Sequence, residues 1–274
     1  MPEWREIPIR DLPSELTREV HQKIRFHGVT MVAARADGGE PVCCSGTFTT
    51  INGIAGILTA RHVWEIIERA PTLALLVGGR PYYLDPRILR AFGPGYDDTL
   101  AEVAARVPDI AFVHIPPEAC GAIEAYGKVF YSIDRRRRDP EMAFFSDRGF
   151  WILAGSPQAL FGAATGMAPS FLYDTFVDRH VEAGAWDYLF VNLNLDQNPE
   201  IPRTYGGMSG GGIWRAAFSL SEDQTVFAVE NPQRDIVLSG VAFYQTGPEG
   251  RQIIGHGPKS LYATLPGLCV DEVT

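Results

Sequence analysis

Three short segments dominate the sequence: Leu-Thr-Ala-Arg-His at 58–62, Asp-Ile-Ala at 109–111 and Gly-Met-Ser-Gly-Gly at 207–211. They supply a base, an acid and a nucleophile. A serine hydroxyl is a weak nucleophile at neutral pH, and it becomes reactive when a histidine takes its proton and a carboxylate fixes the tautomer of that histidine. His62 and Asp109 are 47 residues apart, and Ser209 follows 100 residues later. This spacing leaves room for one small β-domain around the first two residues and another around the third.

Glycines surround Ser209 on both sides. Gly207 lies two positions before it, and residues 210–212 are all glycine. Glycine adopts backbone geometries that other residues resist, and it lets a substrate approach closely. The backbone N–H groups of Gly207 and Ser209 are candidates for an oxyanion hole, in which each donor lowers the barrier by about 3 kcal/mol. The alternative is a glycine-rich turn in which the serine is incidental.

The other two segments lie next to predicted strands. His62 follows the apolar residues 57–60, and Asp109 precedes the strand-like run 110–115. A carboxylate at the mouth of a buried strand needs a donor, and Nδ1–H of His62 is a suitable one. Taken singly, each has a plainer reading: a surface histidine and a turn aspartate. Among the other histidines, we expect His180 at the surface, and His256 is a candidate for the wall of a specificity pocket.

Composition indicates an ordinary globular protein. The chain has 274 residues, of which 46% are hydrophobic and 21% charged, enough for one large or two modest domains. The 28 glycines and 20 prolines favour many short strands and turns over long helices. The formal net charge of −9 argues against nonspecific binding of nucleic acid or of anionic lipid.

Nothing in the sequence indicates a membrane or a metal. No apolar run approaches the roughly 18 to 20 residues that span a bilayer, and residues 1–10 have no apolar signal core. The cysteines, at positions 43, 44, 120 and 269, match no zinc spacing. We therefore expect reduced thiols, a cytoplasmic location, no membrane partner, and no metal or cofactor.

The apolar pattern divides the chain into four parts. Leu16, Val20 and Ile24 recur every four residues and predict a helix over 14–26, either docked on the body or removed as a pro-segment. Short strands and turns follow, with a hairpin signal at residues 52–53. Four arginines at 135–138 indicate a solvated connector or, alternatively, a docking or protease-sensitive loop. The predicted boundaries are an N-terminal extension at 1–28, a first barrel at 29–130, a linker at 131–147 and a second barrel at 148–274.

These segments resemble the trypsin/chymotrypsin-like serine proteases, whose triad also runs in the order His, Asp, Ser. The similarity extends over residues 30–265 and includes Cys-Ser-Gly-Thr-Phe at 44–48 and the strand at 238–244. It implies an all-β fold of two perpendicular six-stranded Greek-key barrels with the triad between them. His62 would be the general base, Asp109 its orienting acid and Ser209 the nucleophile. The family also implies that Gly207 and Ser209 donate to the oxyanion, and that Phe243, Tyr244 and Gln245 pair by backbone with an extended peptide.

Departures from the family pattern are informative. Secreted members carry a disulfide from the Cys44 region to the residue after the histidine, which here is Val63. Zymogen-type members have an aspartate just before the serine, where this chain has Met208. The resemblance therefore implies an intracellular enzyme without that activation switch, assembled as made or controlled by a regulatory protein partner. Arg203, six residues before the serine, is a candidate pocket residue that would favour acidic side chains.

Two other interpretations compete with the protease. The sequence at 207–211 also satisfies the G-x-S-x-G elbow of α/β-hydrolases, but that fold needs the order Ser, Asp, His and a helix directly after the serine. A catalytically silent or partner-gated protease-like binding domain is the non-enzymatic alternative. On balance the sequence predicts a serine endopeptidase that acts on protein or peptide substrates through an acyl-enzyme at Ser209.

Overall fold

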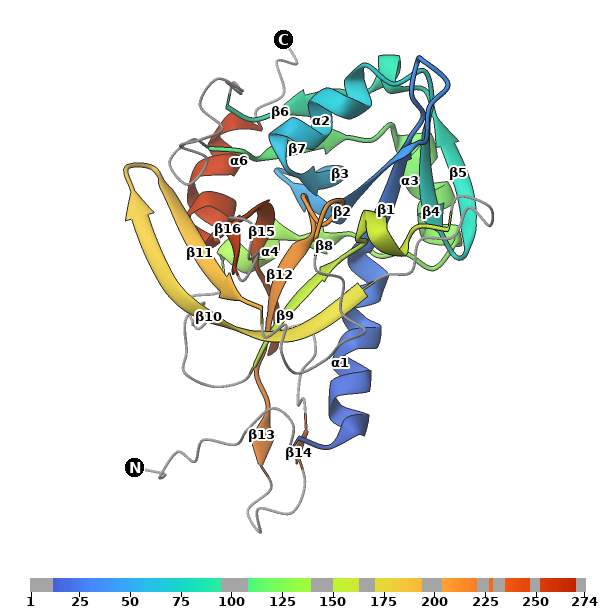
Figure 1. Cartoon of the computed structure of the whole chain (residues 1–274). Helices are drawn as coiled ribbons and strands as arrows, with labels where there is room; N and C mark the ends of the chain where they lie inside the picture. The colour runs from blue at the N-terminus through green and yellow to red at the C-terminus, as the bar shows by residue number, and fades with distance from the viewer. Residues whose placement is uncertain are drawn as a thin grey trace.

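Most of the described chain is β-strand, divided between two units (Figure 1). The computed structural model describes residues 12–94, 108–138, 150–162, 171–193, 204–220, 227–228, 235–246 and 252–269. The first unit contains β1 (Gly28–Ala33), β2 (Val42–Ile51), β3 (Ile54–Thr59), β4 (Leu73–Val77), β5 (Arg80–Leu84), β6 (Arg90–Phe92), β7 (Ala111–His114) and β8 (Tyr131–Ser132). The second contains β9 (Phe150–Gly155), β10 (Phe171–Ala183), β11 (Trp186–Asn192), β12 (Gly212–Ala216), β15 (Ile236–Gln245) and β16 (Gln252–His256).

Strand pairing differs between the units. The first is an eight-stranded sheet in the order β5-β4-β1-β2-β3-β7-β6, with β8 parallel to β2. The second is a closed barrel in the order β10-β11-β16-β15-β12-β9. The all-β class and the closed six-stranded second barrel agree with the sequence-based expectation. The first unit has more than the six strands expected, because the short strands β6 and β8 add to it. A separate two-stranded sheet joins β13 (Ser219–Leu220) to β14 (Phe227–Ala228).

The hairpin between β2 and β3 forms at the predicted turn. Asn52 and Gly53 both have positive φ, at 52° and 79°, and Ile51 pairs directly with Ile54. Positive φ at both central residues is the geometry of a two-residue type I′ turn, which asparagine and glycine favour. This turn sets the register that carries β3 to Thr59, three residues before His62.

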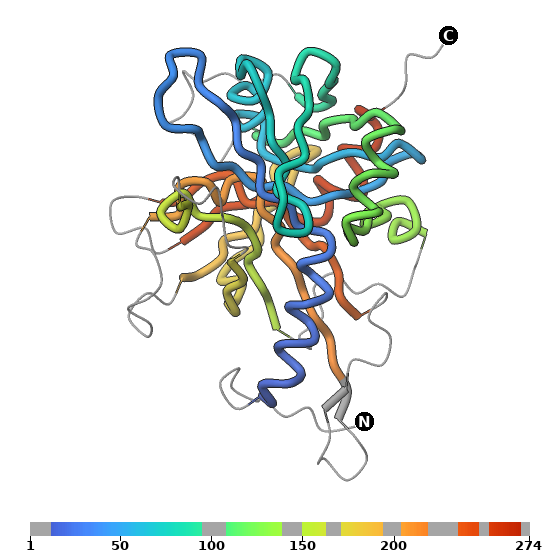
Figure 2. The backbone as a smooth tube through the Cα atoms, turned by 90° about the vertical axis from the view of Figure 1, so that its right-hand side faces the viewer, coloured from blue at the N-terminus to red at the C-terminus, as the bar shows by residue number. Residues whose placement is uncertain are grey.

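Helix α1 (Ser14–His27) has the expected apolar stripe. Leu16, Val20 and Ile24 are buried and pack with residues of both units. The helix extends from the first unit along the side of the second (Figures 1 and 2), where His21 Nε2 lies 2.7 Å from Asp174 Oδ1 on β10. Among the residues described, every helix is too short or too polar to cross a membrane.

The remaining helices of the described chain are short: α2 (Arg61–Glu68), α3 (Pro117–Ala125), α4 (Ile133–Arg137) and, at the C-terminal end, a helical turn at Ser260–Thr264 followed by α6 (Leu265–Leu268). Helix α4 contains three of the four consecutive arginines. Arg136 is buried, lies over the ring of Tyr131 and donates to the Ile236 carbonyl at 3.3 Å. The expectation of a fully solvated arginine run was therefore wrong at this position, because Arg136 joins the first unit to β15.

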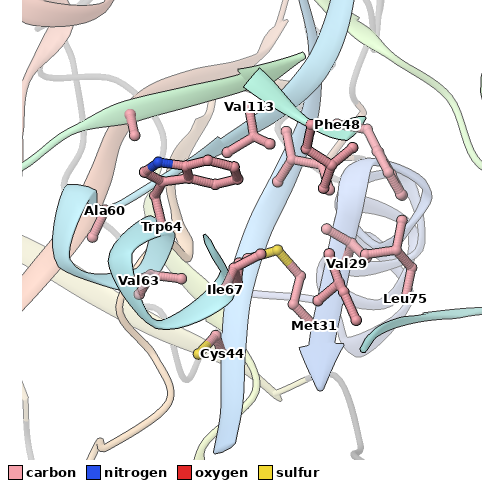
Figure 3. Packing of buried hydrophobic residues seen from close by; sticks show 14 of the residues in the cluster. Val29, Met31, Cys44, Phe48, Ala60, Val63, Trp64, Ile67, Leu75 and Val113 are labelled. Atoms are coloured by element: carbon pink, nitrogen blue, oxygen red, sulfur yellow. The ribbon is translucent and has the colours of Figure 1, made fainter. Parts of the chain in front are cut away.

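A continuous apolar core lies between the units. Leu58 and Phe112 from the first sheet pack in one cluster with Trp214 and Leu238 from the barrel. A second cluster fills the first unit, and α2 covers it: Val63, Trp64 and Ile67 point toward Val113 and Met31 (Figure 3). The two units are therefore held at a fixed relation near the start of α2, where His62 lies.

Candidate active site

The start of helix α2 holds His62 against Asp109. The ring Nδ1 lies 2.6 Å from Asp109 Oδ2, and the His62 backbone N–H donates to Asp109 Oδ1 at 2.9 Å. Each carboxylate oxygen of Asp109 therefore bonds a nitrogen of the same residue, His62. The carboxylate also lies at the positive end of the helix dipole, which favours a negative charge. The sequence predicted the residue pair but placed His62 at a strand end; the helix begins one residue earlier, at Arg61.

The two side chains of this pair differ in their exposure to solvent. The Asp109 side chain is 8% exposed, whereas that of His62 is 28% exposed. With Nδ1 committed to the buried carboxylate, the other ring nitrogen is the one that can exchange a proton with a reactant. This is the geometry of a general base whose orientation and tautomer are fixed by a carboxylate.

The loop around Ser209 has a backbone that only glycine permits at two positions. Gly207 has φ +89°, and a Cβ there would lie 2.7 Å from both the Gln158 nitrogen and the Ser156 carbonyl oxygen. Gly210 has φ +87°, and a Cβ there would clash with the Thr59 side chain and the Ser45 carbonyl oxygen. The glycines are therefore required both by conformation and by close packing.

These contacts fix the serine loop to the strands that lead to His62. The Ser45 N–H donates to the Ser209 carbonyl at 3.2 Å, and Thr59 Oγ1 donates to the Ser45 carbonyl at 2.8 Å. Gly210, next to Ser209, packs directly on Thr59. The nucleophile segment of one unit and the base segment of the other therefore lie side by side. The Ser209 hydroxyl itself donates to the Phe243 carbonyl at 3.3 Å.

Peptide orientation in the loop leaves two N–H groups for an anion. The Gly206 carbonyl accepts from the Gln158 N–H at 2.6 Å, and the Met208 carbonyl accepts from the Gly211 N–H at 2.8 Å. In a trans peptide the N–H points opposite to the carbonyl. The N–H groups of Gly207 and Ser209 therefore point away from those partners, and within the described residues neither donates to a protein acceptor.

Phe243, Tyr244 and Gln245 form the end of β15 beside this loop. The strand pairs with β12 only as far as Val241, while Tyr244 and Gln245 remain paired with β16. Phe243 lies at a β-bulge; its side chain is buried, and Tyr244 is 40% exposed. The Gln245 side chain accepts from the Tyr205 N–H at 2.9 Å. In the described chain, no strand pairs with residues 243–245 on the edge opposite β16, where the Phe243 carbonyl accepts the Ser209 hydroxyl.

Three further residues were named from the sequence, and their outcomes differ. His256 is fully buried next to Asp109, so it lines no specificity pocket. His180 is 27% exposed and pairs with Asp187 at 2.9 Å. Arg203 lies outside the described residues. Thr59 and Ser45 had no predicted role of their own, because what marks them is their contact with glycines more than 150 positions later in the chain.

The cysteines are free thiols, as expected. Burial raises the pKa of Cys43 and Cys44 to about 12, which makes these thiols poor nucleophiles. Within the residues described, no group of three or more His, Cys, Asp or Glu side chains is arranged to hold a metal ion.

Comparison with known proteins identifies the fold. The sequence matches no protein-family profile and no curated protein. The structure matches that of an inactivated protease paralogue from the scabies mite with a TM-score of 0.50 and 12% identity, over 87% of this chain and 91% of that one. It also matches the active form of the Rv3671c protease from Mycobacterium tuberculosis with a TM-score of 0.49 and 10% identity, over 98% and 93% of the two chains.

At 12% identity the match to the scabies mite paralogue bears on architecture and not on activity. The scabies mite paralogue makes the point directly, since its description as inactivated shows that the fold persists without catalysis. The two β-units, the closed second barrel and the few helices are those of a chymotrypsin-like protein. In fold, the chain is similar to the trypsin/chymotrypsin-like serine proteases that its motifs already resembled.

Proposed function

We propose that this protein is a serine endopeptidase that cleaves protein or peptide substrates through an acyl-enzyme at Ser209. His62 takes the hydroxyl proton as Ser209 attacks the scissile carbonyl, and it later returns a proton to the leaving amine. Asp109 holds the Nδ1–H tautomer and stabilises the imidazolium as it forms. The observation that carries the proposal is the 2.6 Å His62–Asp109 bond on a helix start whose preceding strand packs against the Ser209 loop.

The oxyanion hole follows from the loop geometry. The Gly207 and Ser209 N–H groups would donate to the carbonyl oxygen as it becomes an anion, which strengthens both bonds in the transition state relative to the bound substrate. Because Gly207 needs φ +89°, the donor position is set by the fold before substrate arrives. Such preorganisation lowers the barrier without a reorganisation cost.

We infer that an extended substrate lies along the edge of β15 opposite β16. Its backbone would pair with that of residues 243–245, as an added strand. The buried Phe243 ring takes no part in recognising side chains, whereas the half-exposed Tyr244 is placed to contact them. We place the activity in the cytoplasm, where the free thiols of the described cysteines would remain reduced.

A fluorophosphonate probe tests the proposal, because it labels only an activated serine. We expect labelling of the wild-type protein and hydrolysis of unfolded protein substrates. Ser209→Ala and His62→Ala should each lower turnover by several orders of magnitude. His114→Ala, which removes a partly buried histidine from the same unit, is the matched control and should retain activity. Equal hydrolysis by wild type and Ser209→Ala would refute the proposal.

One observation favours a second candidate, a silent or partner-gated binding domain. The Ser209 hydroxyl donates to the Phe243 carbonyl, so its proton must first turn toward His62. In exposed side chains such rotations take picoseconds to nanoseconds, which makes this a small obstacle for an enzyme. A protein that binds extended peptides but never labels at Ser209 would support the second candidate.

A further inference from the structure

A second histidine lies directly behind the base–acid pair. His256 ends strand β16 and is completely buried. Its ring packs among the rings of Trp186, Tyr188 and Phe243, with centroid distances of 5.5, 5.1 and 4.9 Å. His256 therefore contacts the residue whose carbonyl accepts the Ser209 hydroxyl bond, while its Nε2 reaches Asp109.

The hydrogen bonds of His256 fix its tautomer. Nε2 lies 2.9 Å from the backbone nitrogen of Asp109, which can only donate, so Nε2 carries no proton. The proton of a neutral ring is then on Nδ1, which lies 3.3 Å from Ser260 Oγ. His256 thus accepts from the backbone of the catalytic acid on one side and donates to a serine on the other.

Ser260 in turn is anchored on a buried carboxylate. Its hydroxyl donates to Asp187 Oδ1 at 2.7 Å, and Asp187 is fully buried on β11. Asp187 also accepts the N–H groups of Ser260 at 2.7 Å and Lys259 at 3.1 Å, and His180 Nε2 lies 2.9 Å from Oδ2. Both oxygens of the Asp187 carboxylate therefore have hydrogen-bond partners. This residue anchors, in the second barrel, the series of hydrogen bonds that runs from Ser260 through His256 to Asp109.

We propose that His256 is a positioning residue of the triad, a neutral imidazole that holds the Asp109 backbone so that its carboxylate meets both His62 groups. The inference rests on the proposed protease function for its kinetic consequences, but its structural content does not. Asp109 lies in the first unit, and His256 lies in the second. The link therefore couples the orientation of the base–acid pair to the unit that carries the nucleophile.

The electrostatic setting supports a ring that stays neutral. Burial lowers the pKa of His256 to about 4, although the carboxylates of Asp109 and Asp187 act in the opposite direction. Among the described residues, Tyr188 on β11, His62 beyond Asp109 and His180 on β10 beyond Asp187 are further titratable groups nearby. A protonated His256 would present an N–H to the N–H of Asp109 and lose the bond. The acceptor is thus preserved through the pH range in which an ordinary histidine titrates.

Nitrogen-15 NMR of histidine-labelled protein tests the tautomer without any need for activity. The His256 resonances would be assigned by their loss in a His256→Gln variant. Between pH 5 and pH 8 we expect a protonated Nδ1 and an unprotonated, hydrogen-bonded Nε2, with no titration. A protonated Nε2, or titration with a pKa near 6.5, would overturn the inference even if the protein were a confirmed protease.

Two substitutions at His256 separate positioning from packing. Glutamine offers an amide oxygen close to the position of Nε2, whereas leucine fills the space without an acceptor. Because misplacement of a reacting group costs about a hundredfold in rate, we expect His256→Leu to lower kcat between tenfold and a hundredfold with KM nearly unchanged. His256→Gln should recover most of kcat.

His27→Leu is the matched control. His27 also sits in an aromatic cluster and bonds a carbonyl, that of Val129 at 2.8 Å, but it contacts none of the proposed catalytic residues. It should leave kcat and KM unchanged. Equal kcat in His256→Leu and wild type would overturn the positioning role alone. Failure of the wild type itself to label or hydrolyse would count against the proposed function, and the NMR result would still decide the inference.

Discussion

The two halves of the site are built in different ways. In the first unit, His62 and Asp109 are joined by two direct bonds, and the helix that carries the histidine is anchored by Trp64 and Ile67 in a dense core (Figure 3). In the second unit, Ser209 is held by backbone contacts that glycines permit, several of them to residues of the first unit. The base–acid pair is bonded within its own unit, and His256 of the second unit supports it through the Asp109 backbone. The nucleophile is positioned only when both units dock. Substitutions in the first region should therefore act mainly on turnover, and substitutions in the second mainly on stability.

The largest expected effect is the loss of turnover when the His62–Asp109 pair is broken, and the stability of the fold should change little. Asp109→Asn keeps the size of the side chain but offers an amide where Nδ1–H needs a carboxylate, and it favours the wrong imidazole tautomer. We expect kcat to fall by about four orders of magnitude. Turnover should be measured beside the urea midpoint, which should move little. A variant within tenfold of wild type would contradict the role of Asp109.

The next effect tests the docked half. Gly210→Ala places a methyl group against Thr59 and Ser45 at a φ of +87°. Backbone strain and overpacking should together destabilise the protein by roughly 2 to 5 kcal/mol. Gly206→Ala is the matched control, because a Cβ there meets no atom within 4 Å. Urea unfolding of both variants would reveal the difference, and equal midpoints would show that the close approach is not required.

A third effect is the pH dependence that His256 confers on stability. Its folded pKa of about 4 lies below the unfolded value of 6.5, so the unfolded chain binds more protons between these limits. Stability is therefore full above about pH 6.5, falls as the pH drops toward 4, and stops changing below that, with a total loss of about 3 kcal/mol from this group. Replacing His256 with glutamine should remove that part of the slope. Unchanged slopes in urea titrations from pH 7 to pH 4 would contradict the account.

The smallest effect concerns the bond between strands that supports the serine loop. Thr59→Val keeps the shape but removes the hydroxyl that donates to the Ser45 carbonyl at 2.8 Å. We expect a loss of about 1 kcal/mol, whereas Thr59→Ser, which keeps the donor, should retain that bond. Thermal unfolding of the pair provides the measurement. A Thr59→Ser variant less stable than Thr59→Val would indicate that the methyl group, not the bond, matters here.

Local patterns predicted much of this structure. The Asn52-Gly53 hairpin, the apolar stripe of α1 and the all-β class follow from periodicity and turn chemistry, which act over a few residues. The pairing of His62 with Asp109 was inferred because a base needs an orienting acid. The catalytic roles of these residues stay predictions until activity is measured.

Features that depend on contacts between the units could not be read from the sequence. As a candidate for the wall of a specificity pocket, His256 was misplaced, since nothing local marks its contact with Asp109, which lies 147 positions earlier. Arg136 looked solvated within a run of arginines, yet it is buried on Tyr131. Nor did the sequence show that the helix after β3 already begins at Arg61 and includes His62. For His256 and Arg136, a distant partner, not the neighbouring sequence, decides the outcome.

A crystal structure of the protein after reaction with a fluorophosphonate would show whether Ser209 is the nucleophile of this site. We expect phosphorus bonded to Ser209 Oγ, one phosphonyl oxygen accepting the N–H groups of Gly207 and Ser209, and the His62 ring beside the adduct with Nδ1 still bonded to Asp109. An adduct on a different residue, or a His62 ring turned away from the modified serine, would contradict it.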